Sequence, residues 1–331
     1  MRKISVLITT YNRPAKLKRL LESIFRFALP ETAEVIVFIN GADKETEAVL
    51  AELAASHNNI RCVKSSRVNR AEARNTLIKM SEGKILYFLD DDVVVDKDVF
   101  ALIGKKFQEY GDISIIGGPN LNMRGSSLFQ ECQGLALASC FGTLWVSQRY
   151  KRSGKDRRVD ESGLILCNLA AKKEIFAETD IRFPGNFISA EENLLLARFA
   201  RLGYKAMYIP ELEVFHERRN TYRAFFRQII SYGRGRAQVF KTFPAHISPI
   251  YFILAGLLLC LSAAPFIRPR LYFNALLIYL LLDILFSLKI SCQKKNLREF
   301  LPLLLIFPTI HFAYMFGLLT GILNKRSKIR L

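Results

Sequence analysis

Short apolar runs rich in β-branched residues alternate with amphipathic stretches between residues 4 and 89, and this alternation constrains the fold more than any other feature of the chain. The apolar runs predict strands at residues 4–10, 34–39, 60–63 and 84–89. The stretches between them predict helices at residues 15–28, 44–56 and 70–81. Strands and helices that alternate at this spacing form βαβ units with right-handed crossovers. We therefore predict an α/β fold whose mostly parallel sheet is flanked by helices.

The chain changes character from residue 244 onward. Three long apolar segments there are each near the length needed to cross a bilayer: 250–267, 271–288 and 300–323. We therefore predict two domains, an α/β domain at residues 1–243 and a membrane-associated helical region at residues 244–331. Pro302, Pro308 and His311 interrupt the third segment. A re-entrant or interfacial helix is therefore an open alternative to a third crossing.

The basic excess indicates which partners the chain contacts. The formal net charge is +18, and much of the positive charge brackets the hydrophobic C-terminal region. This placement favours anionic membrane lipids and a diphosphate substrate as partners, and it disfavours nucleic acid. The six cysteines are scattered without a CxxC pair, a pattern typical of reduced thiols. We expect a membrane protein whose catalytic domain faces the cytoplasm.

Polar residues follow two of the predicted strands at their carboxyl ends. Thr9-Thr10-Tyr11-Asn12 closes the first strand, and Asp90-Asp91-Asp92 follows the fourth. Ligands of open α/β sheets bind beyond the carboxyl ends of the strands, so we expect both segments to lie at one crevice. Three adjacent carboxylates repel one another unless a cation is present, and Mg²⁺ or Mn²⁺ takes such oxygen ligands. A solvated acidic loop that caps the next helix is the structural alternative.

Further segments extend these two motifs into a pattern that resembles the family 2 glycosyltransferases of GT-A fold. The matching segments, in chain order, are Thr9–Arg13, Arg70–Asn75, Gly83–Asp92, Gly117–Pro119, Cys167–Ala170, Ala190–Leu194 and Ile209–Pro210 followed by His216. The likeness covers roughly residues 3–240. It implies a GT-A-type nucleotide-binding sheet and an inverting transfer of a sugar from a nucleotide donor.

The resemblance implies a donor site that holds a divalent metal, Mn²⁺ or Mg²⁺. Asp92 would bind the metal directly, Asp90 would hold the metal or the ribose, and His216 would be a further ligand. The nucleotide would contact Thr9, Tyr11, Asn12, Arg70, Arg74, Asp90 and Asp91. A hydrogen-bonded strand-end histidine and a solvated basic helix face are the structural alternatives. Many family members carry Asp where this chain has Ile39, so the identity of the base stays open.

Two further groups complete the expected site. The resemblance implies that Glu192, more than its neighbour Glu191, is the general base that deprotonates the acceptor hydroxyl. The family usually has Asp where Glu192 stands, and a structural role in the first helical turn is the alternative. The glycines at 233 and 235 predict a flexible cationic loop in which Arg234 and Arg236 bind phosphate. A basic collar on anionic lipid headgroups is the alternative there.

The expected function is metal-dependent, inverting transfer of one sugar from a nucleoside diphosphate donor to a hydroxyl of a lipid-linked or saccharide acceptor. Cell-surface polysaccharide or glycolipid synthesis is the expected setting. The absence of a Q-x-x-R-W motif favours a single transfer over processive polymerisation. A polyprenyl-phosphate glycosyl synthase is the near alternative. A nucleotidyltransferase and a catalytically inactive membrane protein that binds nucleotide are more distant ones.

Overall fold

The computed structural model describes residues 4–27, 33–185, 187, 189–243, 256 and 269–324. The chain divides into two units. The first unit comprises Met1–Gly125, Gln148–Gly185 and Glu191–Glu217. The second unit comprises Ser126–Ser147, Asn186–Ala190 and Arg218–Leu331. The predicted boundary between residues 243 and 244 stays a prediction.

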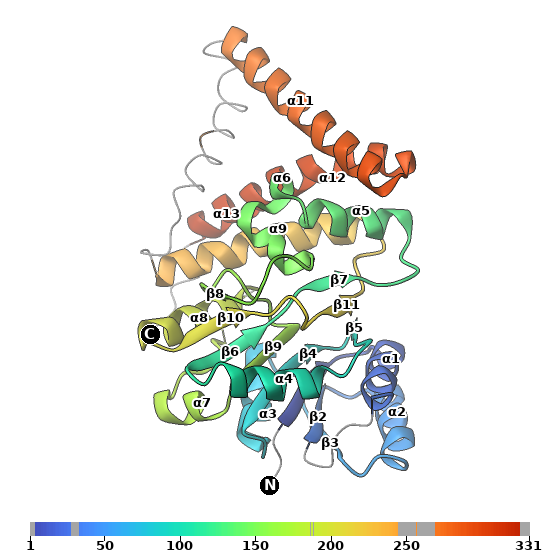
Figure 1. Ribbon diagram of the computed structural model, residues 1–331, viewed down its shortest axis with the longest axis vertical. Coiled ribbons are helices and arrows are strands. Elements are labelled where there is room, and N and C mark those ends of the chain that lie inside the picture. The colour runs from blue at the N-terminus through green and yellow to red at the C-terminus, as the bar shows by residue number, and fades with distance from the viewer. Residues whose placement is uncertain are drawn as a thin grey trace. The chain divides into compact units, whose positions relative to one another are not determined.

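The first unit is built on an eight-stranded sheet with the order β3-β2-β1-β4-β9-β6-β10-β8 (Figure 1). The strands are β1 (Ile4–Thr10), β2 (Ala33–Asn40), β3 (Ile60–Ser65), β4 (Ile85–Asp90), β6 (Ile113–Gly117), β8 (Arg157–Val159), β9 (Asn168–Lys172) and β10 (Lys205–Tyr208). β1 to β4 are parallel, and β10 is parallel to β6. β9 runs antiparallel between β4 and β6, and β8 is antiparallel to β10. The prediction of a mostly parallel α/β sheet is confirmed.

Helices cover both faces of this sheet. They are α1 (Pro14–Phe25), α2 (Lys44–Ala54), α3 (Arg70–Met80), α4 (Val99–Glu109), α7 (Glu174–Thr179) and α8 (Glu191–Arg201). One core cluster joins α1, α2 and α4 to one face, and the other joins α3, α7 and α8 to the opposite face. Val37 and Phe38 on β2 belong to different clusters, because successive side chains of a strand point to opposite faces. Strands buried on both faces read as continuous apolar runs, which is why the sequence pattern located them.

A second, small sheet lies next to the carboxyl end of β4. It has the order β5-β11-β7, formed by β5 (Val93–Val94), β11 (Val214–His216) and β7 (Asn120–Asn122). His216 pairs with Val93, directly after the acidic triplet, and the N–H of Glu217 donates to the carbonyl of Asp92 at 3.0 Å. This sheet therefore carries a distant histidine to the acidic strand end.

The second unit is helical. Its helices are α5 (Leu128–Leu137), α6 (Cys140–Thr143), α9 (Tyr222–Thr242), α11 (Pro269–Lys294), η3 (Leu297–Glu299), α12 (Phe300–Pro308), η4 (Thr309–Ala313) and α13 (Tyr314–Leu323), while η1 (Leu144–Tyr150) leads from this unit into the first. α9 and α13 pack closely because glycines line their contact. A Cβ atom on Gly233 would lie 2.0 Å from the carbonyl oxygen of Tyr314, and one on Gly317 would lie 2.2 Å from that of Ile230.

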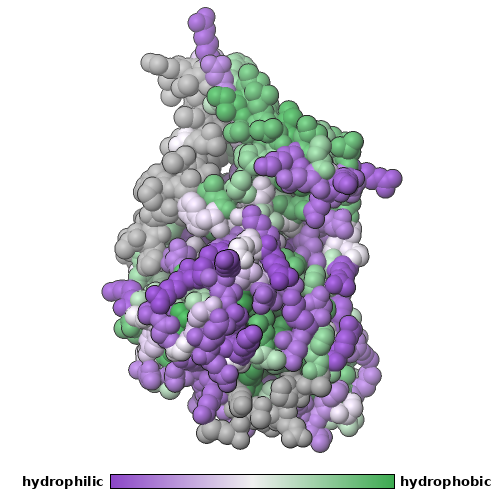
Figure 2. Space-filling model, viewed as in Figure 1, coloured by the Kyte–Doolittle hydropathy of each residue, from purple (hydrophilic) through white to green (hydrophobic). Residues whose placement is uncertain are grey.

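Two stretches of this unit, Tyr272–Lys294 and Leu297–Leu323, are long and apolar enough to cross a membrane. The second passes Pro308 without breaking, because a π-helical turn at Thr309–Ala313 absorbs the ring and the missing N–H. α11 exposes a broad apolar surface (Figure 2). Its exposed side chains include Phe273, Leu277, Ile278, Leu281 and Leu285. The segment predicted at residues 250–267 lies outside the described residues except for Gly256.

Candidate active site

The polar ends of β1 and β4 lie side by side. Thr9 pairs in register with Asp90, and the buried hydroxyl of Thr10 donates to Asp91 Oδ2 at 2.9 Å. The chain then turns at Asn12, whose φ of 50° is in the left-handed region that asparagine tolerates. The N–H of Asn12 donates to Asp43, which also caps α2. The structure thus brings the two predicted motifs to one edge of the sheet.

Arg13 holds two of the three aspartates. Its Nη1 lies 2.9 Å from Asp91 Oδ1 and 3.4 Å from Asp92 Oδ2. Burial raises the pKa of Asp91 to about 6, although Arg13 opposes that shift. Both carboxylates are buried, so they fasten the strand end to the start of α1. The predicted contact of Asp91 with the nucleotide stays a prediction.

Asp92 and His216 form a buried pair. His216 Nε2 lies 3.2 Å from Asp92 Oδ1. Burial opposes ionisation of Asp92, but His216 and Arg13 outweigh it and hold the pKa of that carboxyl well below its usual range. Asp92 is therefore a carboxylate at neutral pH, and it orients the imidazole. That Asp92 binds a metal directly stays a prediction.

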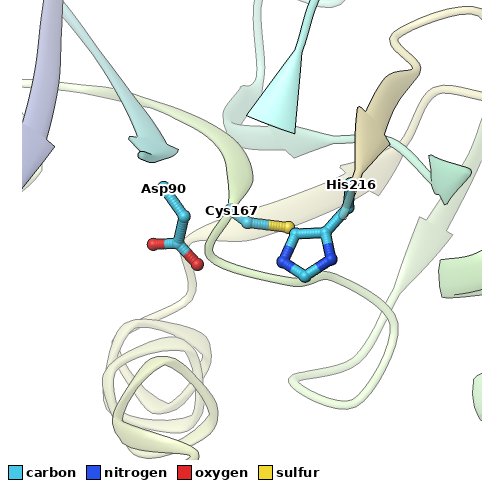
Figure 3. A group of neighbouring side chains, drawn as sticks. All are labelled: Asp90, Cys167 and His216. Atoms are coloured by element: carbon cyan, nitrogen blue, oxygen red, sulfur yellow. The ribbon is translucent and has the colours of Figure 1, made fainter. Parts of the chain in front are cut away.

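Three side chains at this edge form a group that fits a divalent cation. A carboxylate oxygen of Asp90, Sγ of Cys167 and a ring nitrogen of His216 all lie within 4.8 Å of one another. They approach from the end of β4, the start of β9 and the end of β11 (Figure 3). His216 Nδ1 is buried and has no hydrogen-bond partner among the described residues. A carboxylate oxygen, a sulfur and an imidazole nitrogen at this spacing are ligand types that a divalent cation accepts. The sequence had paired Asp90 with His216 but had missed Cys167.

Arg74 joins the acidic strand end to the beginning of α8. Its guanidinium lies 3.6 Å from Asp90 Oδ1 and pairs directly with Glu191. Arg74 is buried, whereas Arg70, one helical turn earlier, is exposed. The prediction that both arginines hold a phosphate stays a prediction, and in the structure Arg74 bridges two carboxylates.

The two adjacent glutamates have different surroundings. Glu191 is buried against Arg74; burial raises its pKa, but the guanidinium outweighs burial and the net pKa is lowered. Glu192 is partly exposed, and burial together with the negative charge of Glu191 raises its pKa. Both stand in the first turn of α8, where the helix dipole favours carboxylates. The pKa of Glu192 is thus shifted in the direction that favours a general base, and its predicted role as that base stays a prediction.

Tyr11 forms an exposed aromatic platform beyond β1. Its ring is 40% exposed, and the Arg67 guanidinium lies over it at 4.6 Å from the centroid. The ring also lies against Gly41, whose φ of +107° favours glycine. Ile39 is fully buried in the core cluster that includes α1, which accounts for an apolar residue there. Arg67 carries no motif, so sequence reasoning missed it.

Asn168 links three segments around the site through side-chain hydrogen bonds. It accepts a hydrogen bond from Tyr87 at 2.8 Å and donates to the carbonyls of Pro119 and Leu212. Gly118 permits the close approach of those segments, because a Cβ atom there would lie 1.7 Å from the Leu212 carbonyl oxygen. The segments that resembled the family at 117–119 and 167–170 therefore hold β6, β9 and the loop before β11 in register.

The expectation of a flexible loop around Arg234 and Arg236 is wrong. Both arginines lie within α9, a continuous helix, and Arg236 is buried. Gly233 and Gly235 serve close packing within the second unit rather than flexibility: a Cβ atom on Gly235 would lie 2.3 Å from the Ser189 carbonyl oxygen. Phosphate binding by the two arginines stays a prediction.

Comparison with known proteins agrees with this architecture. The family model described as glycosyl transferase family 2 matches residues 5–178, more than half of the chain. The chain belongs to glycosyl transferase family 2. The match spans the ends of β1 and β4 and includes Cys167.

This family 2 glycosyltransferase has similar relatives in archaea. It is 23% identical to Glycosyltransferase AglE of Haloferax volcanii over 71% of this chain and 73% of that protein. It is 20% identical, over 99% of both chains, to a Methanococcus voltae dolichyl N-acetyl-alpha-D-glucosaminyl phosphate 3-beta-D-2,3-diacetamido-2,3-dideoxy-beta-D-glucuronosyltransferase.

Solved structures share the fold of this glycosyltransferase. A mannosyltransferase from Pyrobaculum calidifontis, solved with GDP-Man and Mn²⁺, superposes with a TM-score of 0.60 at 17% identity, over 98% of this chain and 88% of that one. TarS residues 1–349 of S. aureus with UDP-GlcNAc superposes with a TM-score of 0.52 at 15% identity, over 96% and 91%. At these identities the likeness establishes the GT-A fold alone.

Proposed function

We propose that this family 2 glycosyltransferase moves one sugar from a nucleoside diphosphate donor to a hydroxyl of a lipid-linked or saccharide acceptor, with inversion. One observation carries the proposal. Arg74 bridges Asp90, at the candidate cation site, to Glu191, whose neighbour Glu192 has a raised pKa. A place for an anionic leaving group thus adjoins a place for a base, which is the arrangement that single displacement at an anomeric carbon needs.

On the donor side, Asp90 and His216 would hold a divalent cation, Mn²⁺ or Mg²⁺. Such a cation supplies Lewis-acid stabilisation to the departing nucleotide. Asp92 keeps the His216 ring in place, and Arg13 keeps Asp91 and Asp92 in place. Tyr11 stacks on the base. Thr9, Asn12 and Arg70 complete the nucleotide contacts.

On the acceptor side, Glu192 accepts the proton of the attacking hydroxyl. Glu191 stays ionised against Arg74, so its negative charge keeps the pKa of Glu192 raised. A raised pKa makes a carboxylate a stronger base, so Glu192 is the better proton acceptor of the two glutamates. Glu191 in this scheme positions Arg74 and tunes its neighbour, and Glu192 alone contacts the acceptor.

The lipid-linked acceptor is supported by two observations. The Methanococcus voltae relative, similar over the full length, is named for a dolichyl phosphate-linked sugar acceptor. This chain also carries two helices long and apolar enough to cross a membrane, which would confine the enzyme to the surface that holds such an acceptor. We propose that the catalytic unit faces the cytoplasm, that basic residues such as Arg234 contact anionic lipids, and that the product enters cell-surface polysaccharide or glycolipid.

The test is release of nucleoside diphosphate by the detergent-solubilised full chain across a panel of nucleotide sugars, with Mn²⁺, Mg²⁺ or EDTA and a membrane lipid extract. We expect release from one donor that stops with EDTA. Glu192→Gln should lower kcat by about 10²- to 10⁴-fold and leave the donor Kd unchanged. Glu45→Gln, an exposed change on α2, is the matched control.

Two outcomes would redirect the proposal. Full activity of Glu192→Gln, with polyprenyl phosphate as the accepted substrate, would favour a polyprenyl-phosphate glycosyl synthase, because an acceptor that is already an anion needs no base. Release of pyrophosphate instead of a nucleoside diphosphate would favour a nucleotidyltransferase.

A further inference from the structure

We propose that Cys167 is a direct ligand of the cation at the donor site, so that Asp90, Cys167 and His216 form a mixed oxygen–sulfur–nitrogen site that prefers thiophilic cations such as Zn²⁺, Co²⁺ and Cd²⁺. This inference rests on the proposed donor site and goes beyond it, because neither the acidic motif nor the resemblance supplies a sulfur ligand.

The first argument is convergence. Cys167 ends the loop before β9, Asp90 ends β4 and His216 ends β11, yet their ligand atoms lie within 4.8 Å of one another. Cys167 is 2% exposed and His216 is 9% exposed, while the Asp90 side chain is 38% exposed. Because Asp90 is the exposed member of the group, the substrate's own oxygens would reach a cation from its side.

The second argument is the state of His216. Its Nε2 lies 3.2 Å from Oδ1 of Asp92, which is itself buried. Its Nδ1 is buried without a hydrogen-bond partner among the described residues. Histidines that bind metals commonly contact a carboxylate that holds the ring in place. Asp92 thereby acts as a positioning residue.

The third argument is the partner of the sulfur. The Asn120 side-chain amide donates to Cys167 Sγ at 3.4 Å, and Asn120 is itself buried on β7, beside β11. An N–H directed at sulfur stabilises a thiolate more than a thiol, because the donor meets a full negative charge. A buried cysteine that only fills space needs no such donor. On binding, the cation displaces the thiol proton to solvent.

This ligand set changes which cations the site prefers. Thiolate and imidazole favour Zn²⁺, Co²⁺ and Cd²⁺ over Mg²⁺, which favours oxygen. We therefore expect Cd²⁺ and Zn²⁺ to compete with Mn²⁺ at low concentration. We also expect bound cation to protect Cys167 from thiol-alkylating reagents.

The deciding experiment is a Co²⁺ titration of the full chain in detergent. The signal is the thiolate-to-cobalt charge-transfer absorption band in the near ultraviolet. The wild type should show the band at saturation. Cys167→Ser should lose it and bind Cd²⁺ about tenfold or more weakly, with a smaller change for Mn²⁺. Cys132→Ser, a buried cysteine of the second unit, is the matched control and should keep the band.

Circular dichroism and thermal unfolding establish whether the Cys167→Ser protein is folded. Cys167→Asp is a second variant, in which a carboxylate replaces the thiol. The Cys167→Asp protein should bind Mg²⁺ and Mn²⁺ through oxygen ligands and should lack the charge-transfer band. An undiminished band in both Cys167 variants would overturn the inference. Nucleoside diphosphate release without any band in the wild type would also overturn it, while leaving the glycosyltransferase proposal standing. A band that disappears in Cys167→Ser without release from any donor would support the ligand and count against the donor function.

Discussion

At the scale of residues, the three adjacent aspartates have three different roles. Asp90 keeps an exposed carboxylate at the strand end, whereas Asp91 and Asp92 are buried and paired. Asp91 holds Thr10 and Arg13, and Asp92 holds His216. The repulsion among neighbouring carboxylates is relieved by the guanidinium groups of Arg13 and Arg74 and by the contact between Asp92 and the His216 imidazole. Asp90, the most exposed of the three, is the one left for the cation that we propose.

The two adjacent glutamates of α8 also differ in their surroundings, and their pKa values shift in opposite directions. Arg74 lowers the pKa of Glu191 against the effect of burial, and burial together with the Glu191 charge raises the pKa of Glu192. Neighbouring titratable groups whose pKa values are pushed apart take different roles in acid–base chemistry. The residue with the raised pKa, Glu192, is the one that we propose as the base.

The pH dependence of transfer follows from this pair. Glu192 must be ionised to act as a base, so kcat falls as the pH drops through its raised pKa, at a higher pH than an ordinary glutamate would set. Glu191→Gln removes a negative charge beside Glu192. It also leaves the positive charge of Arg74 without its paired carboxylate, so that this charge acts more strongly on Glu192. Both changes favour the ionised form and lower the pKa of Glu192. We expect the acidic limb of the kcat–pH profile to shift to lower pH.

The profile is measured on wild type, Glu191→Gln and the exposed control Glu45→Gln, which should retain the wild-type limb. An acidic limb that moves to higher pH in Glu191→Gln would contradict the assigned coupling between the two glutamates.

At the scale of elements, the site depends on a β11 strand that reaches β5 and β7. Its approach is set by the Gly117–Pro119 turn, where the N–H of Ile209 donates to Gly117 and the N–H of Val214 donates to Pro119. Gly118 is the tightest point, with no space for a side chain. Packing of this turn therefore places His216 opposite Asp90.

Gly118→Ala should destabilise the first unit. The added methyl would overlap the backbone of Leu212, which cannot move without shifting the loop before β11. We expect the free energy of unfolding to fall by about 3 kcal/mol and cation binding to weaken. Thermal unfolding measures the first effect, and a Co²⁺ titration measures the second.

Gly104→Ala is the matched control, because Gly104 lies in α4 with open space around its Cβ position. Alanine in a helix is favoured over glycine, so that variant should be as stable as wild type or slightly more stable. Equal thermal stability of Gly118→Ala and Gly104→Ala would show that the backbone at Gly118 and Leu212 has room for a methyl group.

At the scale of the whole molecule, the chain combines an α/β unit whose apolar residues are inside with a helical unit whose apolar residues are partly outside. α11 exposes the apolar side chains of Leu277, Leu281 and Leu285. Exposed apolar surface of this extent marks an interaction site, and a lipid bilayer is the partner that a long apolar helix fits.

Membrane retention tests this assignment. The full chain should stay with membranes after washing with high salt and alkaline carbonate. Leu281→Arg combined with Leu285→Arg should reduce retention, since arginine near the centre of a bilayer costs about 3 kcal/mol per residue. Leu202→Arg, an exposed change in the first unit, is the control and should be retained like wild type. Complete release of the wild type by salt alone would point to a peripheral association.

The sequence by itself determined the elements of the first unit between residues 4 and 90 and the position of the acidic motif that follows them. Buried strands and amphipathic helices leave local periodicities, so β1 to β4 and α1 to α3 start and end within a few residues of the predicted limits. Membrane-length apolar segments are local signals too. The family resemblance added Glu192 and His216, which are far from the acidic motif in the chain.

Only the tertiary structure decided which side chains meet. β9 inserts antiparallel between β4 and β6, and this placement, which no local pattern encodes, sets Cys167 beside Asp90. The pairing of Arg74 with Glu191 likewise depends on how α3 and α8 pack on one sheet face. The glycines near Arg234 predicted a flexible loop because glycine lowers helix propensity, but close helix packing outweighed that propensity. Contacts between distant residues follow from sheet order and helix packing, and these depend on the whole chain rather than on any segment of it.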